Sequence, residues 1–172
     1  MKNVAIAPAR VDEAGQILKL QRLSYRTEAA LYDDWTLPPL TQTLRELLER
    51  YDDHTILAAR LGDEVVGSVR ARLKDGTCYV GRLVVHPRLQ RRGLGTRLMR
   101  EIEASFPAAR RYELFTGHLS EGNLRLYRRL GYEAFREEEI SPSLRLVYLE
   151  KPRGGPQRRP GARVGLGARS TA

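Results

Sequence analysis

The sequence predicts an α/β fold, with a mixed central sheet of about seven strands and helices on both faces. Strand-like and helical segments alternate in the order strand, two helices, three strands, helix, strand, helix, two strands. A loop rich in arginine and glycine joins an apolar strand directly to an amphipathic helix, a connection that recurs in α/β proteins. The length of 172 residues suits one domain with a sizeable core.

The first part of the chain predicts a short strand over residues 4–7 and then two helices. The apolar face of the first helix consists of Ile17, Leu20, Leu23, Tyr25 and Ala30. The segment 33–39 ends this helix, because paired prolines cannot continue it. Thr41 begins the second helix, whose apolar face consists of Leu44, Leu47, Leu48 and Tyr51.

Three strands are predicted next, over residues 55–60, 64–71 and 77–85, with a hairpin turn at 74–76 before the last. Gly81 lies in the middle of the third strand, where a glycine indicates a bulge or a close backbone approach. The only cysteine, Cys78, precedes it, so no internal disulfide can form. We expect a buried and unreactive thiol there.

The second half predicts two helices and three strands. The first helix begins at Leu94 and repeats an apolar residue at every fourth position: Leu94, Leu98, Ile102 and Phe106. A strand over 112–116 and a helix over 120–130 follow, and Gly131 is expected to be the C-cap of that helix. Two strands, near 133–140 and 144–150, complete the sheet.

The loop from Gln90 to Thr96 predicts an anion site. The first amides of a helix have no partners within it, and the glycines let a ligand approach the backbone closely. A P-loop would need Gly-Lys-Ser/Thr, which is absent. A dinucleotide loop would need glycine at Leu98, although Glu113 has the spacing of its ribose carboxylate. The pattern Gln/Arg-x-x-Gly-x-Gly is matched in full by Gln90-Arg91-Arg92-Gly93-Leu94-Gly95.

This last pattern resembles the pyrophosphate loop of the GCN5-related N-acetyltransferases. Leu83-Val84-Val85-His86-Pro87 is similar to the family's fourth strand, and residues 123–132 are similar to its later Leu-Tyr-x-x-Leu-Gly-Tyr helix. The resemblance covers residues 1–151 and implies an N-acetyltransferase domain with the family's acyl-CoA N-acyltransferase fold. It implies direct transfer, in a ternary complex, of an acetyl group from acetyl-CoA to a primary amine of a small molecule or protein.

Carried over residue by residue, the resemblance implies a coenzyme site and one catalytic residue. Tyr127 is the expected acid that protonates the departing sulfur, although its helical spacing also suits a core aromatic. Ser120 stands where the family usually has asparagine, and it either contacts the coenzyme or caps the helix. The residues expected to bind acetyl-CoA are Leu83, Val84, Val85, Gln90, Arg91, Arg92, Gly93, Leu94, Gly95, Thr96, Ser120, Asn123 and Tyr127.

The general base is missing from the family's usual places. The stretch 77–82 contains no acid where many members have a glutamate, and another family position falls at Phe115. The candidates by proximity alone are Glu113, His118 and Tyr79. We expect the acceptor near the segment 32–39, where Trp35 either packs on the amine or anchors the core. No spacing indicates a metal site.

The positive charge is concentrated at the C-terminus. The chain has a formal net charge of +9, and residues 153–172 hold five arginines and no acid. We expect residues 152–172 to form a basic, disordered tail. The arginines have no aromatic residues between them, which argues against nucleic acid as a partner. A nucleic-acid-associated protein acting through this tail is one alternative function; a non-catalytic acyl-CoA-binding or regulatory domain is the other.

Targeting signals and oligomeric state complete these expectations. The chain has no run of about 18 apolar residues, and its N-terminus lacks the apolar core of a signal peptide. We therefore expect a cytoplasmic protein with no membrane partner. Dimers are common in the family that the chain resembles, so a homodimer stays open.

Overall fold

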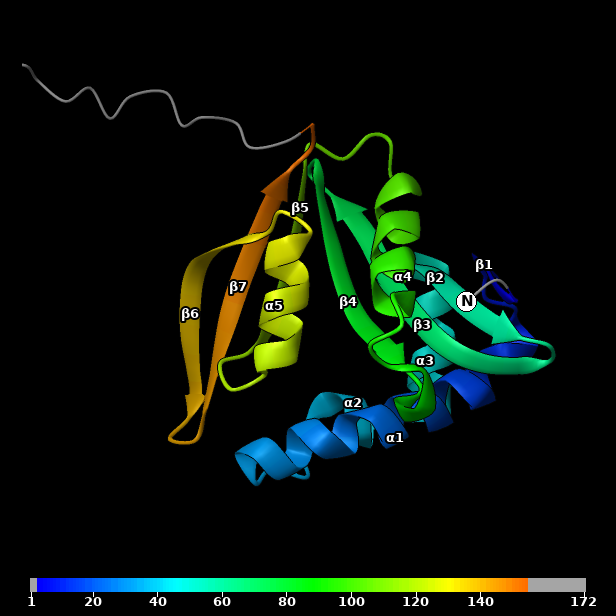
Figure 1. The fold of residues 1–172 in the computed structure, drawn as a ribbon, viewed down its shortest axis with the longest axis horizontal. Coiled ribbons are helices and arrows are strands. Elements are labelled where there is room, and N and C mark those ends of the chain that lie inside the picture. Colours follow the sequence, from blue (N-terminus) through cyan, green and yellow to red (C-terminus); the bar gives the residue numbers. More distant parts are fainter. Residues whose placement is uncertain (1–2, 155–172) are drawn as a thin grey trace, which may run out of the picture.

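The computed structural model describes residues 3–154 and contains one seven-stranded sheet with helices on both faces (Figure 1). The strand order is β1-β2-β3-β4-β5-β7-β6, and neighbouring strands are antiparallel except for β4 and β5. The strands are β1 (Val4–Pro8), β2 (Thr55–Leu61), β3 (Glu64–Lys74), β4 (Thr77–Val85), β5 (Arg111–Gly117), β6 (Glu133–Ser141) and β7 (Leu144–Pro152). The helices are α1 (Ala14–Tyr32), α2 (Pro38–Thr41), α3 (Leu44–Asp53), α4 (Leu94–Ala104) and α5 (Glu121–Arg129), with short 3-10 helices at Val11–Glu13 and Pro87–Leu89. The predicted α/β class is confirmed.

Apolar clusters cover both faces of the sheet. The cluster below α4 and α5 includes Leu94, Leu98, Ile102 and Tyr127. The cluster below α1 and α3 includes Ile17, Leu18, Leu20 and Leu47. Cys78 is fully buried in the first cluster, and burial raises the pKa of its thiol to about 12, so the thiol is unreactive as expected.

The segment between α1 and α3 differs from the prediction. Paired prolines begin the short helix α2, because a proline in the first turn lacks only an N–H that has no partner there. The second long helix begins at Leu44, not at Thr41. Thr43 caps it: its hydroxyl accepts the Glu46 amide at 3.2 Å, and the Glu46 carboxylate accepts the Thr43 amide at 3.1 Å.

Three other helix details can be compared with the prediction. Ala30 is exposed, so it is not part of the buried face of α1, and Phe106 lies beyond the end of α4. Gly131 follows α5 with φ of 96°, and the Tyr132 amide donates to the Tyr127 carbonyl at 3.0 Å. These are the features of a Schellman ending, so the glycine ends α5 as predicted.

β4 and β5 separate part-way along their length, and this opening organises the rest of the molecule. They pair only over Thr77–Tyr79 of β4, while β5 pairs with β7 as far as Gly117. β4 bulges beside Gly81, as the sequence predicted: Arg82 has φ of 53° and the register with β3 shifts. Figure 1 shows the two strands diverging, with α1 crossing the wide end of the opening.

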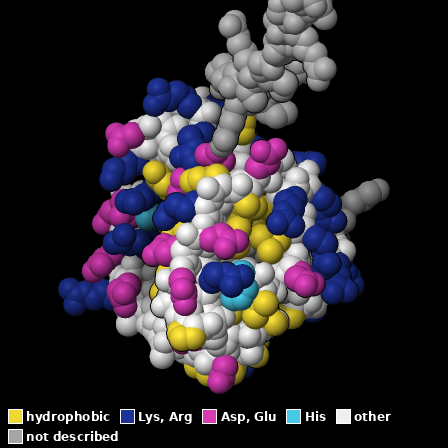
Figure 2. Space-filling view, turned by 90° about the vertical axis from the view of Figure 1, so that its left-hand side faces the viewer, with side chains coloured by type: hydrophobic (Ala, Val, Ile, Leu, Met, Phe, Trp, Pro, Cys, Tyr) yellow, Lys and Arg dark blue, Asp and Glu magenta, His cyan; other side chains and the backbone are white. Residues whose placement is uncertain are grey.

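The outer strand β6 is strongly charged. Along it and the adjacent strand β7, acidic and basic side chains form pairs, such as Arg145 with Glu137. Figure 2 shows acids and bases interspersed over the face that is on the left in Figure 1, with apolar side chains between them. Such charges discourage edge-to-edge association of strands. None of the helices within residues 3–154 is long and apolar enough to cross a membrane.

Candidate active site

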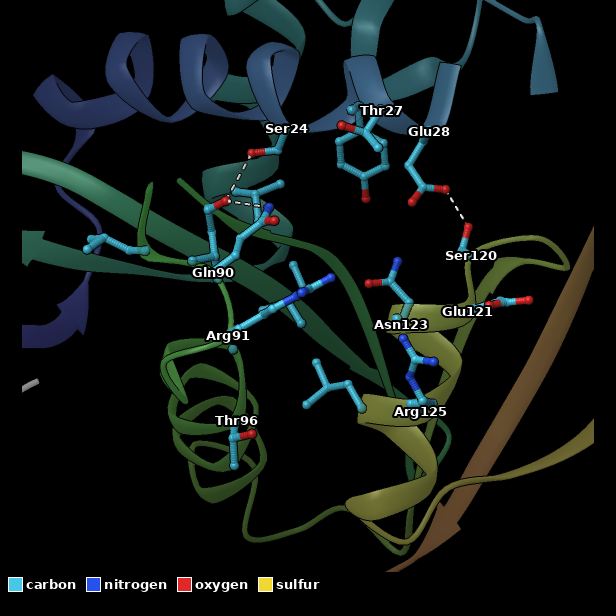
Figure 3. Close-up of a pocket in the computed structure, with 18 of the residues that line it drawn as sticks. Ser24, Thr27, Glu28, Gln90, Arg91, Thr96, Ser120, Glu121, Asn123 and Arg125 are labelled. Carbon is cyan, nitrogen blue, oxygen red and sulfur yellow. Dashed lines mark hydrogen bonds between the residues drawn. The ribbon is translucent and has the colours of Figure 1, made fainter. Parts of the chain in front are cut away.

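A cleft of about 770 Å³ occupies the opening between β4 and β5 (Figure 3). Its walls come from α1, the end of β4 with the following loop, the start of α4, and α5. Ten of the predicted coenzyme-binding residues line it: Leu83, Val84, Val85, Gln90, Arg91, Gly93, Gly95, Thr96, Ser120 and Asn123. The other three, Arg92, Leu94 and Tyr127, lie outside the lining. The structure thus brings most of the predicted site into one cavity.

One end of the cleft is built to hold an anion. Gly93 is the N-cap of α4 with φ of 82°, a left-handed conformation that favours glycine. The first bond of α4 runs from the Arg97 amide to the Gly93 carbonyl at 3.1 Å, so the three preceding helical amides have no partner within the helix. Leu94 is 1% exposed and can offer a ligand only its backbone. Arg91 adds a cation that points into the cleft in Figure 3.

The middle of the cleft is apolar and narrow. It runs between β4 and α5, where Leu83, Val85 and Leu126 contribute side chains. A Cβ added at Gly95 would lie 3.5 Å from Leu126 Cδ2 and 3.9 Å from the other two. A larger side chain at position 95 would therefore fill this channel, whereas glycine at position 93 is needed for its backbone angle.

Gln90 supports the loop as well as lining the cleft. Its side-chain amide donates to the Val85 carbonyl at 3.3 Å, and the Ser24 hydroxyl donates to the same oxygen at 3.4 Å. These bonds tie the loop and α1 to the end of β4. The edge of β4 from Val80 to Val85 has no pairing with β5, so an extended ligand can add there like a strand.

The other end of the cleft is polar. The Ser120 hydroxyl donates to Glu28 Oε2, and the Tyr32 hydroxyl lies 2.8 Å from Ser120 Oγ. Ser120 is the N-cap residue of α5 by position, but its side chain makes no capping hydrogen bond to the helix amides. Asn123 donates to Thr116 Oγ1 at 3.3 Å and points toward the centre of the cleft in Figure 3.

Comparisons with known proteins identify this architecture. A sequence model of the acetyltransferase (GNAT) family matches residues 17–132, more than half of the chain. The chain belongs to this family. No curated protein sequence matches the chain.

Solved structures agree on the fold of this acetyltransferase. The PaiA N-acetyltransferase of Thermoplasma acidophilum, in complex with coenzyme A, is 16% identical with a TM-score of 0.71 over 87% of this chain and 98% of that one. YncA, a putative acetyltransferase of Salmonella typhimurium with its cofactor acetyl-CoA, is 18% identical with a TM-score of 0.69 over 87% of this chain and 94% of that one. A GNAT-family acetyltransferase of Streptococcus pneumoniae is 21% identical, with a TM-score of 0.66 over 87% of this chain and 99% of that one.

Tyr127 of the acetyltransferase lies behind the cleft wall rather than on it. Its side chain is 7% exposed, and its ring packs edge-on against Tyr132 with 6.0 Å between centroids. Burial raises the pKa of its hydroxyl well above 10, and Tyr25 and Glu28 nearby raise it further. The phenol therefore keeps its proton throughout the ordinary pH range.

The three base candidates taken from the sequence all lie outside the cleft lining. Glu113 is paired with Arg111 at 2.9 Å, Tyr79 lies on the exposed face of β4, and His118 Nδ1 accepts the Arg145 amide at 3.0 Å. The carboxylates that line the cleft are Glu28 and Glu121. Sequence reasoning missed Glu28. Its one local signal is helical spacing, since it shares a face of α1 with Tyr25 and Tyr32.

The expected acceptor segment 32–39 also lies outside the lining. Trp35 is 58% exposed, so it is not a core anchor. Left-handed Asp33, with φ of 47°, ends α1. The part of α1 that faces the cleft lies earlier, from Ser24 to Leu31.

Two partly buried arginines, Arg70 and Arg82, lie near Tyr25. Arg82 shares a hydrogen bond with the Tyr25 hydroxyl, and burial lowers the pKa of its guanidinium. Burial, and then the charge of Arg82, lowers the pKa of Arg70 to about 10. Arg70 Nη1 and Arg82 Nε are buried with no hydrogen-bond partner among residues 3–154. A buried N–H group without a partner is unfavourable, so we expect these two guanidinium groups to destabilise the folded state.

Arg70→Met should raise the thermal stability. A buried N–H without a partner costs about 1–3 kcal/mol, and each kcal/mol corresponds to roughly 2–4 °C in Tm for a chain of this size. We expect calorimetry to show Tm higher by about 2–4 °C. Arg72→Met, at an exposed position of the same strand, is the matched control and should leave Tm nearly unchanged. A lower Tm for Arg70→Met would mean that the guanidinium stabilises the fold.

Proposed function

We propose that this protein is an acetyl-CoA-dependent N-acetyltransferase of the cytoplasm, with its catalytic domain at residues 1–151. In the proposed reaction, an acetyl group passes directly to a primary amine of a small molecule or protein in a ternary complex. The observation that carries the proposal is that three kinds of surface follow one another along the cleft. The unpaired amides at the start of α4 come first, the apolar channel beside the unpaired edge of β4 comes next, and a group of polar side chains comes last.

Acetyl-CoA has parts that suit this order. The amides at the start of α4 and Arg91 would hold its pyrophosphate, because helix N-termini favour anions. The edge of β4 at Leu83–Val85 would pair with its pantetheine arm, and the small Gly95 leaves room for that arm. The coenzyme supplies the acetyl group as a thioester. The polar end, with Glu28, is then the place where the chain meets the amine.

Two measurements on the full chain test the proposal. Calorimetric titration with acetyl-CoA measures binding, and thiol release over a panel of amino acids, polyamines and a lysine-containing peptide measures transfer. Binding together with acetylated product from at least one amine supports the enzyme. Tight binding without turnover of any amine would instead favour the non-catalytic acyl-CoA-binding domain.

Tyr127→Phe should lower kcat with little change in the Kd for acetyl-CoA. The variant keeps the buried ring but removes a hydroxyl whose pKa is raised and which therefore holds a proton to donate. A thiol has a pKa near 8.5, so its anion leaves without much help, and we expect a loss of only about tenfold. Steady-state thiol release gives kcat, and wild-type turnover at every pH would remove Tyr127 as the acid.

A further inference from the structure

We propose that Glu28 accepts the proton of the acceptor ammonium, and that Ser120 and Tyr32 are positioning residues that hold its carboxylate. This inference rests on the proposed function and names the base that the usual family positions lack. Glu28 lines the cleft from α1, and Ser120 reaches it from the opposite wall at the start of α5 (Figure 3).

The direction of the hydrogen bonds around Glu28 follows from the chemistry of its partners. An ionised carboxylate can only accept, so Ser120 gives its single hydroxyl hydrogen to Oε2. The bond of 2.8 Å between Tyr32 and Ser120 must then be donated by Tyr32. The Leu119 amide, which can only donate, gives its hydrogen to the Tyr32 oxygen at 3.0 Å. Every donor in this series of bonds points toward Glu28.

The series of hydrogen bonds is built rigidly. Ser120 and Tyr32 are each 3% exposed, so water does not compete for their hydroxyls. Gly117 allows the arrangement, because a Cβ at that position would lie 2.0 Å from the Tyr32 hydroxyl oxygen. These bonds hold Oε2 of Glu28, and Oε1 is the oxygen left to take a proton from a molecule in the cleft.

The surroundings of Glu28 suit proton transfer. Its carboxylate acts electrostatically on Tyr25 of the same helix and on Tyr127 of α5, both of which burial keeps neutral. The other charged groups that line the cleft are Arg91 in the loop and Glu121, Arg125 and Arg129 on α5, and the centroid of the His118 ring lies 5.7 Å from that of Tyr32. Glu28 is the one carboxylate that lines the cleft from α1.

A general base accelerates the reaction most when the acceptor is a strongly basic amine, because such an amine is protonated at pH 7. An alkylammonium with a pKa near 10 has only about a thousandth of its molecules neutral at pH 7. In the proposed step, Glu28 Oε1 takes one N–H proton, the nitrogen forms a bond to the acetyl carbon, and the carbon–sulfur bond breaks. The bonded nitrogen gives up a second N–H proton as the carbon–sulfur bond breaks, and the departing sulfur takes one proton from Tyr127, which this second proton restores. The products are the N-acetyl amide and the free thiol of the coenzyme. Glu28 returns its proton to solvent.

Glu28→Gln tests the proposal, because glutamine keeps the shape and can still accept from Ser120. With the amine of highest turnover from the panel, kcat/KM at pH 7 should fall by about a hundredfold or more. The loss should shrink as the pH approaches the pKa of the amine, since the amine then loses its proton unaided. Glu49→Gln, on the exposed side of α3, is the control and should match the wild type.

A weakly basic aromatic amine, neutral at pH 7, gives a second readout. With this acceptor, Glu28→Gln should react nearly as fast as the wild type, because no proton has to be removed before attack. Tyr32→Phe and Ser120→Ala should show the same dependence on amine basicity with smaller losses, of about threefold to tenfold. If Tyr32 and Ser120 only stabilised the fold, these substitutions would slow the reactions of both amines equally.

The outcomes separate the inference from the proposed function. If the wild type acetylates an amine and Glu28→Gln matches it at pH 7, the inference is overturned and the acetyltransferase stands. Equal loss with strongly and weakly basic amines also overturns it. If the wild type binds acetyl-CoA but acetylates no amine, the proposed function is overturned and the inference with it.

Discussion

Gly93→Val should weaken acetyl-CoA binding by about tenfold to a hundredfold. Gly93 has φ of 82°, and a β-branched residue held there costs about 1–3 kcal/mol, where each 1.4 kcal/mol is a factor of ten in Kd. Rotating the backbone to relieve this strain turns the first amides of α4 away from the anion. Open space surrounds the position, with no heavy atom within 4 Å of an added Cβ, so the effect comes from backbone angle and not from a clash. Calorimetric titration measures it.

Gly62→Val is the matched control for this prediction. Gly62 has φ of 61° in the turn between β2 and β3, away from the cleft, and a Cβ there also meets nothing within 4 Å. Both variants should lose similar thermal stability, and only Gly93→Val should lose affinity. Equal Kd values for the two variants would contradict the assignment of the loop as the anion site.

Local sequence predicted the parts of the site that local chemistry determines. The loop before α4 needs glycine for a left-handed angle and helix amides for an anion, and both are visible within Gln90–Thr96. The bulge in β4 was signalled by Gly81 in the same way. The mixed sheet with helices on both faces followed from the order of the elements.

The polar end of the cleft could not be predicted, because it is assembled from distant segments. Glu28 and Ser120 are 92 positions apart in the sequence, and a glutamate on a helix is ordinarily expected to be exposed to solvent. The predicted acceptor segment 32–39 does not line the cleft, for a related reason. Its proline-rich composition marked a break correctly, but only the packing of α1 across the cleft shows that the residues before the break face inward.

Arg70 and Arg82 show where the alternation of residues along a strand fails to predict burial. An arginine in an alternating strand indicates a solvent-facing side, yet burial lowers the pKa of both Arg70 and Arg82, and Arg82 bonds to Tyr25 of α1. The bulge at Arg82 changes the side toward which the following residues point, and one residue of slip reverses an entire face. The sequence carries no separate signal for this reversal.

Glu13→Ala should be the most destabilising of these substitutions, by about 3–5 kcal/mol. Glu13 is 2% exposed and pairs through both oxygens with Arg60 of β2, while accepting the Arg10 amide at 2.8 Å. Alanine would leave the Arg60 charge largely buried without its partner, which is the costly way to break such a pair. Urea unfolding measures the loss. Replacing both Glu13 and Arg60 with methionine should cost much less than Glu13→Ala, because no unpaired charge remains.

The same pair makes stability depend on pH in a defined direction. Its hydrogen bond with Arg60, above all, lowers the pKa of Glu13 below its ordinary value of 4.5 in the folded state. The stabilisation is therefore complete above about pH 4.5 and is lost as the pH falls through the lower, folded-state pKa. Tm should drop in that acid range for the wild type, and Glu13→Gln should be less stable at pH 7 with a flatter profile. Because Glu13 immediately precedes α1, which carries Glu28 to the cleft, the same acidification should lower activity once the fold begins to open. Identical acid profiles for the wild type and Glu13→Gln would show that other carboxylates control this transition.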